Sequence, residues 1–167
     1  AVHRTMLIIS PTARISPLAH IEDSVRGTRI EIGDEVLIDS FVRINPSGGS
    51  GDLIISARCY INAGTVIYTG NGIFMGEGAL IAANCTIAPT NHEYRLRSKT
   101  LLQQGFLPSK GGIRIGADAW IGANSVILDG ADIGQGAIIG AGSVVSGVIE
   151  PYSINVGNPL RKIGERR

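Results

Sequence analysis

Aromatic and charged residues are scarce in this chain, and long apolar runs are missing. Aromatic side chains make up 5% of the 167 residues, too few for the stacking platforms that bind single-stranded nucleic acids. The formal net charge is +1 at pH 7, so no overall field would attract nucleic acid or an anionic membrane. No apolar run approaches the roughly 18 residues of a membrane-spanning helix, and no signal-peptide pattern opens the sequence. We expect a cytoplasmic protein with no transmembrane segment and no nucleic-acid partner.

What the chain has instead is isoleucine at every sixth position over most of its length. A small or β-branched residue comes four positions after each isoleucine, and glycine often follows it directly. A period of six fits neither a heptad nor an alternation of strands and helices. It is typical of a parallel β-helix, in which each hexad supplies one short strand and one turn. The repeated positions are Ile15, Ile21; Ile32, Ile38, Ile44; Ile55, Ile61, Ile67; Met75, Ile81, Ile87; Ile115, Ile121, Ile127; and Ile133, Ile139, Val145.

Three hexads make one triangular coil, so the chain is predicted to be a single all-β domain, residues 1–167, of about six coils. We name the three columns of strands in chain order. Stack A contains Ile115, stack B contains Ile121 and stack C contains Ile127. The cysteines, Cys59 and Cys85, occupy the small inward position of a hexad, which favours core packing over a disulfide or a metal site.

Extra residues interrupt the repeat repeatedly at the corner between stacks C and A. They occur near residues 47–53, near residues 71–74, and as a long external loop over 93–112. The loop is both basic and partly apolar, which is unlike solvated disorder and predicts packing on a neighbouring surface. Residues 1–10 and 151–167 are expected to cap the two ends, and Pro151 and Pro159 are expected to exclude regular strand from the second cap.

His92 is the candidate for chemistry among the three histidines. It lies where the fourth coil breaks into the long loop, where a neutral imidazole would accept a proton from a hydroxyl or amine. A solvent-exposed loop histidine is the alternative. His3 and His20 are interpreted as surface residues, so a zinc site built from three histidines, and any other metal, is not expected.

The repeat resembles that of the left-handed β-helix acyltransferases, and left-handedness is implied by this resemblance alone. Asn91-His92 and three further segments resemble the maltose, galactoside and polysaccharide O-acetyltransferases. Those segments are residues 115–123, 139–145 and 156–161. The resemblance implies an acetyl-CoA-dependent O-acetyltransferase that acts on a sugar or glycan hydroxyl in polysaccharide biosynthesis, assembled as a homotrimer.

The same resemblance implies roles for individual residues. His92 matches the catalytic base, and Asn62, Asn91 and Trp120 match acceptor or substrate contacts. The expected coenzyme A contacts are Ala123, Ala141, Ser146, Arg161 and Lys162. Gly147 and Gly164 stand where relatives often carry a lysine or an arginine.

The register adds an argument that does not depend on the resemblance. Asn62 and Trp120 project outward from stack B, and a column of alanines at the next turn leaves a straight groove that suits pantetheine. His92 leaves from the opposite corner, about 10 Å or more away across the core, whereas a base must come within about 3 Å of its proton. One subunit therefore cannot complete the site, and three-fold closure can.

Two other functions remain open from the sequence. An N-acetyltransferase of an amino sugar nucleotide would use the same base and groove. A β-helical scaffold without catalysis would bind no acetyl-CoA.

Overall fold

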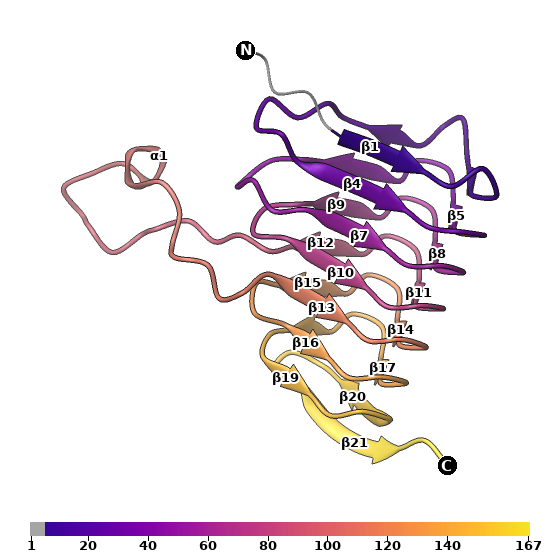
Figure 1. Ribbon diagram of the computed structural model, residues 1–167. Coiled ribbons are helices and arrows are strands. Elements are labelled where there is room, and N and C mark those ends of the chain that lie inside the picture. The colour runs from indigo at the N-terminus through magenta and orange to yellow at the C-terminus, as the bar shows by residue number, and fades with distance from the viewer. Residues whose placement is uncertain (1–5) are drawn as a thin grey trace.

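The computed structural model describes residues 6–167 as a triangular prism of short parallel strands (Figure 1). Residues 1–5, which include His3 and the start of the expected N-terminal cap, lie outside the described residues. Stack A is a seven-stranded sheet: β1 (Met6–Ile9), β4 (Arg29–Ile32), β7 (Leu53–Ile55), β10 (Ile73–Met75), β13 (Ile113–Ile115), β16 (Asp132–Ile133) and β19 (Val148–Ile149).

The other two stacks complete the prism. Stack B has eight strands: β2 (Arg14–Ile15), β5 (Leu37–Ile38), β8 (Tyr60–Ile61), β11 (Leu80–Ile81), β14 (Trp120–Ile121), β17 (Ile138–Ile139), β20 (Ser153–Val156) and β21 (Arg161–Glu165). Stack C has six: β3 (His20–Ile21), β6 (Arg43–Asn45), β9 (Val66–Tyr68), β12 (Thr86–Ala88), β15 (Val126–Leu128) and β18 (Val144–Val145). The six coils predicted by the hexads are therefore present, and β19 and β20 begin a seventh.

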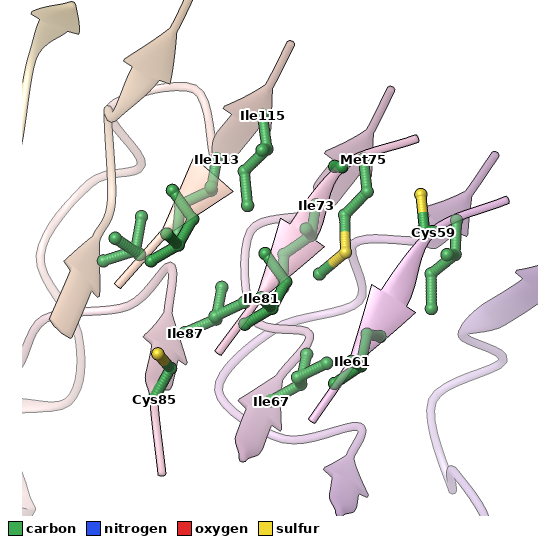
Figure 2. Packing of buried hydrophobic residues seen from close by; sticks show 14 of the residues in the cluster. Cys59, Ile61, Ile67, Ile73, Met75, Ile81, Cys85, Ile87, Ile113 and Ile115 are labelled. Atoms are coloured by element: carbon green, nitrogen blue, oxygen red, sulfur yellow. The ribbon is translucent and has the colours of Figure 1, made fainter. Parts of the chain in front are cut away.

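The repeated isoleucines pair with one another from coil to coil, as the six-residue period predicts. Ile121 pairs with Ile81 on one side and with Ile139 on the other, and all three side chains are fully buried. Figure 2 shows this packing in the middle coils. The small residue of each hexad also points inward, which brings Cys59 and Cys85 into the core. Burial raises the pKa of both thiols, in keeping with a packing role.

The two ends differ in how they finish the sheets. Residues 6–9 of the expected N-terminal cap form β1, which extends stack A and leaves its four apolar side chains partly exposed. At the other end β21 folds back antiparallel onto β20. The expectation that Pro151 and Pro159 exclude strand from 151–167 is wrong. Each proline lies two residues ahead of a strand, where its missing N–H removes no hydrogen bond from the ladder.

The long loop leaves the prism after β12 and returns at β13 (Figure 1). Near its tip it contains one helical turn that the sequence reasoning missed, α1 (Leu101–Gln104). Thr100 and Gln103 form a capping box at its start, and this pattern of threonine followed three residues later by glutamine was readable in the sequence.

Candidate active site

Insertions in four successive coils gather at the corner between stacks C and A. They are residues 22–28, 46–52, 69–72 and 89–112, which connect β3 to β4, β6 to β7, β9 to β10 and β12 to β13. The sequence reasoning identified the last three and missed the first. The gap from Ile21 to Ile32 was the signal for it, because these positions are eleven apart and a regular repeat would place them six apart.

His92 lies in the neck of the long loop, where the outgoing and returning limbs pair. The backbone N–H of Leu107 donates to the carbonyl of Asn91 (2.8 Å), and that of Glu93 donates to the carbonyl of Gly105 (3.0 Å). The His92 ring packs on Phe106, with ring centroids 4.8 Å apart and planes tilted by 39°. Within residues 6–167 its nitrogens have no hydrogen-bond partner, and the side chain is exposed. The imidazole is therefore positioned and open to an incoming group.

A buried carboxylate ties the base of the loop to the prism. Asp129 is 3% exposed. One of its oxygens accepts from the backbone N–H of Gly112 (2.9 Å), and the other accepts from the backbone N–H of Lys110 (2.8 Å) and from the amide of Asn71 (3.3 Å). Since a buried carboxylate without such donors would be costly, these contacts hold the returning limb in place.

Two hollows meet at His92, one on each side along the prism axis. The first, which we call the N-terminal hollow, has a volume of about 430 Å³ and is lined by Arg26, Ser47, Gly48, Tyr68, Ala88, Thr90, His92 and Phe106. The second, the C-terminal hollow, has a volume of about 320 Å³ and is lined by Asn91, His92, Tyr94, Leu107, Lys110, Leu128, Asp129 and Ser146. Both fall near the size range of small-molecule sites, and the two sets of lining residues share His92.

The predicted site residues divide between this corner and stack B. Asn91 and Ser146 line the C-terminal hollow together with His92. Trp120 belongs to stack B and Asn62 directly follows its strand β8, and neither hollow at His92 includes a residue of that stack. The Asn62 amide donates to the carbonyl of Ile81 (2.9 Å), and Trp120 is 49% exposed.

The alanine column lies at the corner between stacks B and C. The carbonyl of Ala83 accepts from Asn124 (3.0 Å), and that of Ala123 accepts from Gly142 (2.8 Å). The backbone N–H groups of Ala83, Ala123 and Ala141 have no acceptor within the described residues. A ligand lying along this column would therefore be met by N–H donors.

The C-terminal basic residues differ in their availability. Lys162 contacts the carboxylates of both Glu150 and Glu165, and these contacts raise its pKa. Arg161 is exposed and forms no ion pair within residues 6–167. For a phosphate of coenzyme A, Arg161 is thus the better candidate of the two. Lys110 is a further cation that the sequence reasoning did not select for this role.

The outward faces of the three stacks are chemically different. Stack A carries ion pairs between Arg29 and Glu31 and between Arg114 and Asp132, together with the outward apolar side chains of Ile54 and Phe74. Stack B presents a register-aligned apolar ladder: Leu37, Tyr60, Leu80, Trp120, Ile138 and Ile154. The last four strands of stack C present Val66, Thr86, Val126 and Val144, whereas its first two present His20 and Arg43. Stack B therefore has the most continuous apolar face, with the composition of a surface that packs on protein.

The tip of the loop is exposed and apolar. Leu102 is 87% exposed, and Tyr94, Leu96 and Leu101 are each at least half exposed. Beside the neck, Arg95 hydrogen-bonds the carboxylate of Glu93. This contact is the main reason that the pKa of Glu93 is lowered to about 2. Within residues 6–167 no helix is long and apolar enough to cross a membrane, and no cluster of metal-ligating side chains forms.

Comparison with known proteins supports this fold and the class of chemistry. Residues 112–147 match the family model described as bacterial transferase hexapeptide (six repeats). A probable acetyltransferase of Mycobacterium tuberculosis is 28% identical over 99% of this chain and 52% of its own length. A chloramphenicol acetyltransferase of Agrobacterium fabrum is 33% identical over 72% of this chain and 55% of its own length. The chain thus spans about half the length of these curated relatives.

Among solved structures, a variant of the N-acyltransferase AntD from Bacillus cereus is similar to this chain. It was crystallised with dTDP-4-amino-4,6-dideoxyglucose and coenzyme A. It is 29% identical, its TM-score is 0.79, and the match covers 97% of this chain and 84% of AntD. The fold is therefore the left-handed parallel β-helix of hexapeptide-repeat acetyltransferases. The relatives are named acetyltransferases and AntD was crystallised with coenzyme A, which supports an acyltransferase.

Proposed function

We propose that this hexapeptide-repeat chain transfers an acetyl group from acetyl-CoA to a sugar or glycan hydroxyl, with His92 as general base. The observation that carries the proposal is the position of His92 between two hollows. Ser146, an expected coenzyme A contact, lies in the C-terminal hollow. We therefore propose that the thioester lies on that side and that the acceptor lies in the N-terminal hollow.

The chemistry requires one proton to move twice. His92 takes the proton of the acceptor hydroxyl as its oxygen attacks the thioester carbonyl carbon. The tetrahedral intermediate then expels coenzyme A as a thiolate, and the imidazolium returns the proton to that sulfur. Phe106 and the backbone pairs of the neck fix the ring, and the backbone N–H groups of the alanine column suit the carbonyls of the pantetheine arm.

We further propose a homotrimer in which each site lies between two subunits. A three-fold axis parallel to the prism axis places equivalent coils of the three chains at the same level along that axis. His92 of one chain therefore faces the middle coils of stack B in the next chain. Those coils carry Asn62, Leu80 and Trp120. The apolar faces of stacks B and C would be buried in this contact, and the ion pairs of stack A would stay in solvent. The exposed apolar loop tip would pack on the same neighbour.

An amine acceptor is the second candidate, because the similar AntD is an N-acyltransferase that was crystallised with an amino-sugar nucleotide. The same base and hollows serve either acceptor. Polysaccharide biosynthesis and a cytoplasmic location remain predictions from the sequence.

The test is release of the coenzyme A thiol with a panel of hydroxyl and amino sugars, glycans and nucleotide sugars. Replacement of His92 by alanine should lower kcat by ~10²–10⁴ and leave acetyl-CoA affinity largely unchanged. His20→Ala is the matched control, since His20 is also exposed but lies on β3 outside both hollows. Turnover in the His92 variant close to that of the control would exclude His92 as the base.

A further inference from the structure

The N-terminal hollow contains a cation without a counter-ion. Arg26 lies in the insertion of the first coil and lines the hollow together with His92. None of the eight residues that line the hollow is acidic. Two carboxylates of these insertions are engaged elsewhere, because Glu22 pairs with Arg43 and Glu93 pairs with Arg95. The exposed Asp23 of the same insertion does not line the hollow. Within residues 6–167 no carboxylate forms an ion pair with Arg26.

The rest of the lining suits the same kind of ligand. Ser47 and Tyr68 contribute hydroxyl groups to the lining, the Thr90 hydroxyl donates to the Gly48 carbonyl (3.3 Å), and Tyr68 and Phe106 contribute aromatic rings. Arginine with hydroxyl donors is a typical combination for a phosphate or a carboxylate, because the planar guanidinium donates two parallel hydrogen bonds. Aromatic faces accommodate a sugar or base ring. A neutral sugar would form no ion pair with Arg26.

We infer that the acceptor carries an anionic group, a phosphate or a carboxylate, and that Arg26 binds it while the reacting hydroxyl or amine lies at His92. The inference rests on the proposed function for the identity of the bound molecule as acceptor. Arg26 is then a specificity-determining residue. It discriminates charged from neutral acceptors and takes no part in the proton transfer. The volume of about 430 Å³ admits a sugar together with its charged substituent.

The test is a binding titration with the wild-type protein saturated with coenzyme A, so that nucleotide probes cannot occupy the cofactor site. The probes are uridine diphosphate for a phosphate, glucuronate for a carboxylate, and glucose as the neutral partner of glucuronate. Arg26→Gln removes the charge at the hollow. Arg29→Gln is the matched control, because it removes the same charge three residues away, on the outer face of stack A and outside the hollow.

We expect at least one anionic probe to bind, and we expect Arg26→Gln to weaken that binding by about tenfold or more. Arg29→Gln should change it less than about twofold, since exposed ion pairs contribute little. Whether uridine diphosphate or glucuronate responds identifies the anion. Equal affinity of the anionic probes for wild type and Arg26→Gln, or anionic probes that bind no better than glucose, would overturn the inference.

Failure of the inference and failure of the proposed function give different results. If the inference alone is wrong, coenzyme A still binds and acetyl transfer still depends on His92, but Arg26→Gln affects charged and neutral acceptors equally. If the proposed function is wrong, coenzyme A does not bind. The same titrations without coenzyme A then still measure whether Arg26 binds the anion.

Discussion

The corners of the prism behave in two ways. At the A–B and B–C corners, from the second coil onward, the third residue after the inward one has a left-handed backbone, as at Asn84, Asp118 and Asn124. These corners stack through repeated hydrogen bonds, such as Asn124 N–H to the Ala83 carbonyl. The C–A corner instead carries the insertions that contain His92 and Arg26, and Asp129 of the fifth coil anchors the longest of them. The regular corners build a rigid frame, and the departures from the repeat supply the candidate site.

The largest loss in the free energy of unfolding should come from a substitution in the core of the regular coils. Ile121→Ala removes a fully buried side chain between Ile81 and Ile139 and should lower the free energy of unfolding by about 2–5 kcal/mol. Denaturant unfolding measures this. A loss below about 1 kcal/mol would mean that the stacked isoleucines do not carry the stability of the prism.

A smaller and more local effect should follow from releasing the loop. In the wild type, backbone N–H groups donate to both carboxylate oxygens of Asp129. Asp129→Asn replaces one of these oxygens by an NH2 group and should lower the free energy of unfolding by about 1–3 kcal/mol. Cleavage by trypsin after Arg95, Arg97 or Lys99 should become faster, whereas Ile121→Ala should not accelerate it selectively. Loop cleavage at the wild-type rate would show that Asp129 does not hold the returning limb.

The smallest effect is expected at Glu93. Its lowered pKa means that the pair with Arg95 is fully formed above the ordinary glutamate range and is lost only as the pH falls through about 2. Titration of Glu93 therefore contributes nothing to the pH dependence of activity between pH 5 and 9. Glu93→Gln should change kcat/KM by less than about threefold, because an exposed ion pair contributes little. A shifted acid limb of the pH–rate profile in this variant would contradict the assignment.

The regular coils were predictable from the sequence, whereas part of the candidate active site was not. The six-residue period predicts the strands, their register and the side chains that point into the core, because the same repeat applies to every coil. Asn91, His92 and Ser146 were selected through the family resemblance and the break in the repeat, and they line the same hollow. Arg26 and Phe106 were missed, since each lies in an insertion whose path the repeat does not determine. Their approach to His92 depends on how separate insertions fold over one corner.

The most direct measurement is complementation between two inactive variants. His92→Ala removes the base, and Ala141→Trp fills the exposed end of the alanine column. If each site combines His92 of one chain with the column of the next, random trimers from an equal mixture restore about one quarter of the sites. Recovery of thiol release to about a quarter of the wild-type rate after denaturation and joint refolding is the predicted result. A mixture no more active than the separate variants would contradict the shared site.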